Sequence, residues 1–159
     1  VSPGRPVRVN DLEQSLHRIV DLLRSWSTPF ALVGGLAVSA RVEPRFTRDA
    51  DLAIAVDDDH EEEQLLGRLR RSGYEVTALV EQERADRLAT ARLQPADSPD
   101  GIVTDLLFAS SGIEIEIVRD ADVLSILPGL ELPVASVGHL IAMKLLARDD
   151  RPTRTTSTP

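Results

Sequence analysis

Two aspartates separated by one residue are the part of this sequence whose types and spacing point most directly to chemistry. Asp49 and Asp51 open an apolar run that extends to Val56 and is typical of a buried strand. Side chains alternate along an extended chain, so both carboxylates project from one face while Ala50 and Leu52 point to the other. Adjacent carboxylates repel each other, and burying either one alone is costly. Magnesium, which proteins hold through carboxylates and substrate phosphates, resolves that conflict.

A glycine pair, separated from the aspartates by thirteen intervening residues, supplies a complementary feature. Gly34 and Gly35 directly follow a short apolar stretch that ends at Val33. Glycine has no Cβ, so backbone N–H groups at a helix start beside this pair can approach a triphosphate closely. Each feature alone is weak, because Gly-Gly often forms a simple turn and Asp-x-Asp is common in exposed loops. Together, and in this order, they indicate a site for a nucleotide and a metal ion.

The surrounding sequence predicts the elements that position these residues. Asn10 and Glu13 form a capping box that opens a helix, and Gly73 is well placed to end a later one. Helices are predicted over about 10–25, 36–40, 58–72 and 136–148, and strands over 29–33, the later part of 45–56, 74–80, 90–94, 102–108 and 113–118. This order indicates a mixed α/β (α+β) domain in which helices flank one sheet.

Length and composition limit the class of protein. A chain of 159 residues is one domain by the usual size, and we expect this domain to span 1–148 with a disordered tail over 149–159. Without cysteine, disulfides and thiolate sites are excluded. No apolar run reaches the roughly 18 residues of a membrane span, and the N-terminus lacks a signal-peptide core. A cytoplasmic protein with no membrane partner is therefore expected.

The net charge of −8 argues at first against a nucleic-acid partner. Much of the acid, however, lies in the run 57–63, which is typical of a helix start where carboxylates complement the helix dipole. Arginines lie elsewhere, so a locally basic face is possible, and net charge leaves the nature of the partner open.

The pattern of an apolar residue, Gly-Gly, a gap and Asp-x-Asp resembles the DNA polymerase β nucleotidyltransferase superfamily. The wider sequence FALVGGLAV (30–38), with Arg45-x-Thr47-x-Asp49-x-Asp51-Leu52, is similar to its AbiEii/AbiGii (MenT-like) toxin branch. Two later stretches, 104–114 and 132–147, also resemble that branch. The resemblance implies a polymerase β-like nucleotidyltransferase fold, with a mixed central sheet flanked by helices.

The resemblance also implies roles for the acidic residues. Asp49 and Asp51 correspond to metal ligands in a two-ion magnesium scheme, in which one ion activates the attacking hydroxyl and the other steadies the triphosphate. Asp105 matches the third acid of the superfamily, which binds the first ion or acts as a base. The alternative for Asp105 is an ordinary strand residue at the sheet edge, and the two readings are evenly matched.

Further residues are implied as contacts to the nucleotide. Gly34 and Gly35 would approach the triphosphate, and Thr47 occupies a Ser/Thr position that contributes to the active site of the toxin branch. Thr47 has a serious alternative as a β-branched strand residue. Arg45 can bind phosphate, although a surface arginine is the default interpretation for it.

Lys144 can be argued from the sequence itself as well as from the family. It is the only lysine among 18 lysine and arginine residues, and it lies near Leu140 and Ile141 on an apolar helix face. A lysine on a buried face needs an anionic partner, such as a triphosphate. The alternative is a lysine that extends to solvent from the rim of the core. The family places a lysine on this helix, which favours the functional role.

The expected activity is transfer of a nucleoside monophosphate from a nucleoside triphosphate, CTP or another pyrimidine nucleotide, to an acceptor hydroxyl. The resemblance implies a bacterial toxin with a cognate antitoxin and the tRNA 3′ end as acceptor. One alternative is modification of a protein or a small molecule. Another is a catalytically inactive relative that serves as a binding module, because the family's later acidic residue has only Asp149 and Asp150 as candidates here.

Overall fold

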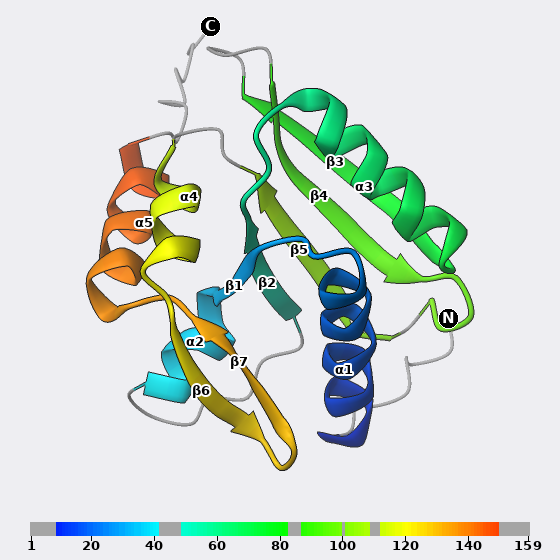
Figure 1. The fold of residues 1–159 in the computed structure, drawn as a ribbon, viewed down its shortest axis with the longest axis horizontal. Coiled ribbons are helices and arrows are strands. Elements are labelled where there is room, and N and C mark those ends of the chain that lie inside the picture. The colour runs from blue at the N-terminus through cyan, green and yellow to red at the C-terminus, as the bar shows by residue number, and fades with distance from the viewer. Residues whose placement is uncertain (1–8, 42–48, 83–86, 100, 109–111, 150–159) are drawn as a thin grey trace, which may run out of the picture.

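A sheet of seven strands lies between helices in this computed structural model, which describes residues 9–41, 49–82, 87–99, 101–108 and 112–149 (Figure 1). The helices are α1 (Val9–Ser25), α2 (Gly34–Arg41), α3 (Asp59–Arg71), α4 (Ile113–Arg119) and α5 (Val137–Asp149). The strands are β1 (Phe30–Val33), β2 (Asp49–Ile54), β3 (Tyr74–Gln82), β4 (Arg87–Pro95), β5 (Val103–Phe108), β6 (Asp122–Leu127) and β7 (Leu130–Val134). The sheet is mixed, as the resemblance implies.

The strand order β3-β4-β5-β2-β1-β7-β6 places β2 at the centre of the sheet. β2 pairs in parallel with β5 and antiparallel with β1, while β1 pairs in parallel with β7. The antiparallel pairs β3–β4 and β6–β7 form the two edges. Asp51 has paired neighbours on both sides, Val33 of β1 and Asp105 of β5, while Asp49 pairs with Val103 of β5.

One face of the sheet packs against α1 and α3 and forms the larger hydrophobic core. Leu16, Ile19 and Leu23 of α1 are completely buried in this core, at helical spacing. Leu52 and Ile54 of β2 are completely buried in the same cluster. The structure therefore confirms the predicted first helix and the inward direction of the apolar residues of β2.

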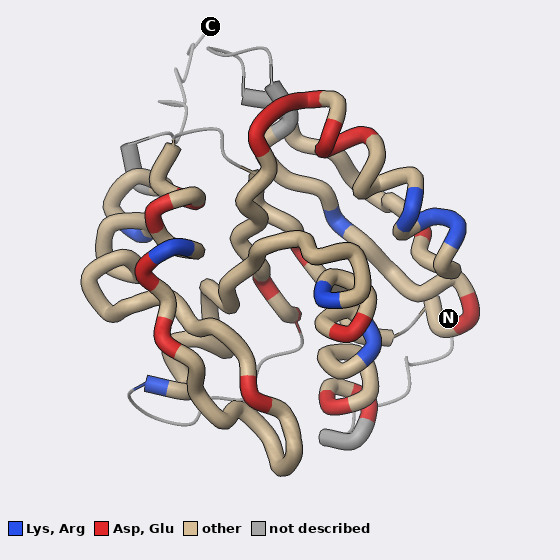
Figure 2. Tube along the Cα trace, in the orientation of Figure 1, with Lys and Arg blue, Asp and Glu red and all other residues tan. Residues whose placement is uncertain are grey.

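Charge is separated along α3, which covers the same core. The Asp58 side chain caps the helix by accepting a hydrogen bond from the Glu61 backbone N–H at 2.9 Å. Acidic residues occupy the first turn and arginines the last, as Figure 2 shows along the trace. This arrangement complements the helix dipole at both ends. The acidic run 57–63 is therefore an exposed helix start, as the sequence predicts, except at Glu62, which is buried.

The opposite face of the sheet packs against α4 and α5 in a smaller cluster. Ala31, Val33 and Ala53 form this cluster with Ile117 of α4, and Met143 of α5 is partly buried against it. α4 and α5 lie side by side (Figure 1), close enough for a 4.0 Å contact between their side chains. Because residues alternate along β2, Asp49 and Asp51 share this second face with Ala53.

The prediction of a strand over 113–118 was wrong, because this segment forms α4. Its alternation of isoleucine with glutamate has the period of a strand, but the segment follows Gly112 in a left-handed conformation with φ 83°. Ile117 is completely buried, whereas Ile115 is 44% exposed. Packing of one helical face therefore overrides the local strand propensity.

The sequence reasoning also missed β6 and β7. β6 is an edge strand without regular burial, and Pro133 interrupts the strand pattern of β7. The predicted tail lies outside the described residues, apart from Asp149 at the end of α5. Within the described part of the chain, no helix is long and apolar enough to cross a membrane.

Candidate active site

Three aspartates occupy neighbouring positions on β2 and β5, and we call them the aspartate row. Asp51 of β2 lies directly opposite Asp105 of β5 in the parallel pairing. Asp49 is on the same face, two residues before Asp51. On β5, Thr104 and Leu106 are buried, while the Asp105 side chain between them remains 14% exposed on the other face. The structure thus brings together the three acidic residues that the sequence proposes as metal ligands.

Gly34 lies against the carboxylate of Asp51. Val33, the last residue of β1, pairs with Asp51 of β2, so Gly34 follows immediately beside it. A Cβ atom on Gly34 would overlap Asp51 Oδ2 and lie 2.9 Å from its Cγ, and the backbone there has φ +68°. Both the space and the backbone conformation require glycine at this position. Gly35 is the next residue and is exposed to solvent in the first turn of α2.

The start of α2 is held beside Asp51 by contacts at the other end of this helix. Arg41 donates hydrogen bonds to the carbonyl oxygens of Ala135 at 2.8 Å and Val134 at 3.0 Å. The same guanidinium forms an ion pair with Asp122 at 3.0 Å. Arg41 therefore fastens α2 to β6 and β7. Free N–H groups at a helix start favour anions, so the start of α2 suits a phosphate next to the aspartate row.

Crowding of the carboxylates changes the acidity of Asp51. Burial is the main cause that raises the pKa of Asp51 from 3.8 to about 6, and the charges of Asp105 and Asp49 raise it further. The charge of Arg92 opposes this effect. Burial and the two neighbouring carboxylates together thus outweigh Arg92 and disfavour the ionised form of Asp51. A divalent cation bound by oxygen ligands would favour the ionised form.

Arg92 is the residue at this site that the sequence reasoning did not single out. It lies on β4 directly opposite Asp105. Its Nε and Nη2 atoms donate to Oδ1 and Oδ2 of Asp105, both at 2.9 Å. In the sequence Arg92 is one of many arginines. The burial of Ala91 and Leu93 on either side shows that Arg92 faces away from the core, but only the strand pairing reveals its partner.

Lys144 does not lie on a buried face, so the sequence argument that burial demands an anionic partner was wrong. Lys144 is exposed, and its neighbours Ile141 and Leu145 are each 56% exposed. The side of α5 that packs on the sheet carries Leu140 and Met143 instead. A solvated lysine needs no buried anion, so a role in nucleotide binding depends on the family resemblance. Arg45 and Thr47 lie outside the described residues.

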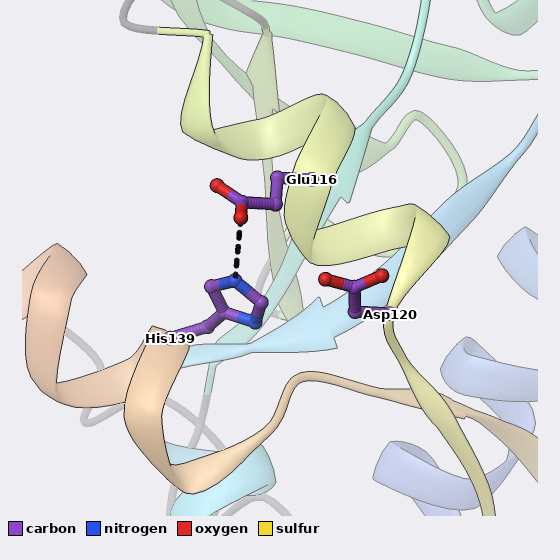
Figure 3. A group of neighbouring side chains, drawn as sticks. All are labelled: Glu116, Asp120 and His139. Carbon is purple, nitrogen blue, oxygen red and sulfur yellow. Dashed lines mark ion pairs between the residues drawn. The ribbon is translucent and has the colours of Figure 1, made fainter.

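A second group of potential ligands, which we call the α4–α5 cluster, consists of Glu116, Asp120 and His139 (Figure 3). One ligand atom from each residue lies within 4.8 Å of the others. The His139 Nδ1 atom lies 2.9 Å from the Ser136 hydroxyl. Arg119 already pairs with Asp120 at 3.0 Å and with Glu116 at 3.9 Å. Glu116 and Asp120 are both exposed, whereas Asp51 and Asp105 are partly buried, so this cluster is a weaker candidate than the aspartate row.

Comparison with protein families gives one extended match. The family described as "Nucleotidyl transferase AbiEii toxin, Type IV TA system" matches residues 20–156, which include both glycines and the whole aspartate row. No curated protein matches the chain in sequence.

Several solved structures share this fold. TM1012 from Thermotoga maritima, assigned as a nucleotidyltransferase, has a TM-score of 0.63 at 16% identity, over 90% of this chain and 88% of that one. The antibiotic-resistance factor ANT(2″)-Ia has a TM-score of 0.56 at 18% identity, over 90% and 78% of the two chains. A nucleotidyltransferase-like protein from Paracoccidioides brasiliensis has a TM-score of 0.53 at 22% identity, over 94% and 71%. At these identities the likeness establishes the polymerase β-like nucleotidyltransferase fold.

Proposed function

The chain belongs to the AbiEii family of nucleotidyltransferase toxins, and we propose that it transfers a nucleoside monophosphate from a triphosphate to tRNA. The acceptor in this proposal is the hydroxyl at the tRNA 3′ end, and pyrophosphate is the leaving group. The observation that carries the proposal is that the aspartate row lies beside the start of α2, where Gly34 is directly next to the Asp51 carboxylate.

The aspartate row fits a divalent cation. Its carboxylate oxygens are the donors that magnesium prefers, and the pKa of Asp51 is raised by burial first and then by the charges of Asp105 and Asp49, which a cation would offset. Asp49, Asp51 and Asp105 would hold the metal, with triphosphate oxygens completing its coordination. Magnesium at this position supplies activation of the attacking hydroxyl and neutralises charge on the leaving pyrophosphate.

The nucleotide would extend from the aspartate row toward α2. Gly34 leaves room for the Asp51 carboxylate directly beside the start of α2, and the N–H groups of the first turn of α2 would offer donors to a phosphate there. We assign Gly35, Arg45, Thr47 and Lys144 to nucleotide contacts on the basis of the family resemblance. The proposed triphosphate is CTP or another pyrimidine nucleotide.

The partners follow from the family. Its members are toxins of type IV toxin–antitoxin systems, so a cognate antitoxin is implied. A tRNA acceptor places the reaction in the cytoplasm. The overall charge of −8 is unevenly distributed, with acidic residues at the start of α3 and the arginines Arg68, Arg70 and Arg71 in its last turn.

The test is incubation of the purified protein with each labelled triphosphate, magnesium and total bacterial tRNA. We expect label from one triphosphate to enter tRNA with the wild-type protein and not with Asp49→Ala. Asp57→Ala is the matched control, because Asp57 is an exposed aspartate on the same stretch of chain but beyond the far end of β2. The proposal fails if tRNA stays unlabelled with every triphosphate, or if Asp49→Ala labels as well as the wild type.

The same assay separates the alternative acceptors. Label in a protein band, or in an added aminoglycoside, would assign another acceptor to the same transferase chemistry. The second option has a precedent in the fold, because one solved neighbour at 16% identity contains adenylyl-2″-tobramycin. Absence of any magnesium-dependent triphosphate binding would instead indicate an inactive relative that acts as a binding module.

A further inference from the structure

Arg92 holds one member of the aspartate row through a two-point contact. Nε and Nη2 of the guanidinium each lie 2.9 Å from a different oxygen of Asp105. The Asp105 side chain is 14% exposed, whereas Arg92 is 51% exposed. The less exposed partner is therefore the one whose orientation is fixed, and the guanidinium reaches it from the solvent side.

The strand register places Arg92 and Asp51 on opposite sides of Asp105. Asp105 pairs with Arg92 across β4–β5 and with Asp51 across β5–β2. The three side chains thus form a line across the sheet, with Asp105 in the middle. A change in the two-point contact made by Arg92 would therefore alter the orientation of the Asp105 carboxylate, which lies next to Asp51.

The two hydrogen bonds from Arg92 leave Asp105 able to bind a cation. An ionised carboxylate has about four lone-pair positions, and Arg92 uses one on each oxygen. The planar guanidinium fixes the carboxylate plane, which a lysine ammonium with its single point of charge does not. The remaining lone pairs of Asp105 then keep a defined direction relative to the Asp51 carboxylate.

We propose that Arg92 is a positioning residue that orients Asp105 so that Asp105 and Asp51 share one divalent cation. This inference rests on the proposed metal-dependent function and adds a residue to it. Arg92 acts through Asp105 and is not itself a metal ligand, because a guanidinium has no acceptor atoms.

A purely stabilising role would have a different signature. Because Asp105 is only 14% exposed, loss of its partner Arg92 would lower the free energy of unfolding, but a purely stabilising role would leave the metal affinity of the folded protein unchanged. Removal of an outer residue that orients a metal ligand, by contrast, typically lowers metal affinity or activity by about 10–100-fold. Metal affinity, measured apart from stability, therefore distinguishes the two roles.

The experiment is a titration of the full chain with Mn²⁺, in which free Mn²⁺ is followed by electron paramagnetic resonance. Arg92→Lys keeps the positive charge but cannot make the two-point contact with Asp105, and Arg92→Gln loses both the charge and this contact. We expect both variants to bind Mn²⁺ at least about tenfold more weakly than the wild type. Arg18→Lys is the matched control, because Arg18 pairs with Asp97 outside both the aspartate row and the α4–α5 cluster, and we expect wild-type affinity from it.

The outcomes separate this inference from the proposed function. If Arg92→Lys binds Mn²⁺ as the wild type does while Asp51→Ala does not bind it, the positioning role is overturned and the metal site stands. Tighter binding by Arg92→Gln also overturns it, because Arg92 would then compete with the cation. A wild-type protein that binds no Mn²⁺ overturns both. Circular dichroism and thermal midpoints of all variants verify that each one is folded.

Discussion

The aspartate row and the α4–α5 cluster are both groups of acidic side chains, yet their surroundings differ. The aspartate row lies on two adjacent central strands, where Asp105 is 14% exposed and is neighboured by Asp51. The α4–α5 cluster lies at a helix end, where Glu116 and Asp120 are 53% and 45% exposed. Strands hold the first group in a fixed register, whereas solvent surrounds much of the second.

The difference appears in the acidity of the carboxyl groups. Burial and two neighbouring carboxylates raise the pKa of Asp51 to about 6. A hydrogen bond from Arg119 lowers the pKa of Asp120. Burial and neighbouring carboxylates thus keep the pKa of Asp51 raised even though Arg92 pairs with Asp105, whereas the exposed Asp120 is compensated by Arg119. Proximity of carboxylates alone does not identify a metal site, because burial and existing partners decide what a metal would add.

The largest expected contrast is in catalysis. Asp51→Ala should reduce nucleotide transfer by about a thousandfold or more, since a bound metal contributes several kcal/mol to such reactions. Asp120→Ala should remain within about twofold of the wild type, because an exposed carboxylate outside the aspartate row contributes no such stabilisation. Initial rates with saturating magnesium and triphosphate measure both. Equal losses in the two variants would remove the distinction between the two groups.

A second contrast concerns the space beside Asp51. Gly34→Ala introduces a Cβ that overlaps the Asp51 carboxylate, and we expect about a 100-fold loss of transfer, because small displacements of catalytic groups have effects of that size.

Gly129→Ala is the control for Gly34→Ala. Gly129 also has a positive φ, 75°, but a Cβ there would meet nothing within 4 Å. Both variants should lose about 1–2 kcal/mol of stability through backbone strain, and only Gly34→Ala should lose activity. Denaturant melts and transfer rates of the two variants test this. A similar loss of activity in both would mean that backbone strain, and not the overlap with Asp51, is responsible.

The smallest expected contrast is in the dependence of stability on pH. The pKa of Asp51 rises from 3.8 to about 6 on folding, so the folded state binds more protons between these pH values. The free energy of unfolding therefore falls as pH rises from about 4 to about 6, and the loss is complete above that range.

Asp51→Asn has no carboxyl group to ionise, so the loss of stability caused by ionisation of Asp51 is absent from this variant. Without added metal, the variant should be about 1–3 kcal/mol more stable than the wild type at pH 7.5, and this gain should vanish near pH 4. Thermal midpoints at both pH values measure the effect, with the exposed Asp57→Asn as a control that shows no such pattern. Identical pH profiles for wild type and Asp51→Asn would contradict the repulsion inferred within the aspartate row.

Much of the fold could be predicted because its signals are local. The apolar spacing of α1, the glycine after β1 and the apolar run of β2 each lie within one segment. Predictions failed where a segment's packing departs from its local pattern. The alternating residues 113–118 form α4, and β7 contains Pro133. Lys144 was placed on a buried face because α5 is apolar around most of its surface.

The sequence by itself determined that Asp49 and Asp51 share one face of a strand and that a glycine pair precedes them, because side-chain alternation is a property of a single strand. Only the tertiary structure decided that Asp105 and Gly34 both lie next to the Asp51 carboxylate. It also decided that Arg92 donates two hydrogen bonds to Asp105. These neighbours come from different strands and a helix start. Their alignment depends on strand register, which is set by packing across the whole sheet and has no local signature in the chain.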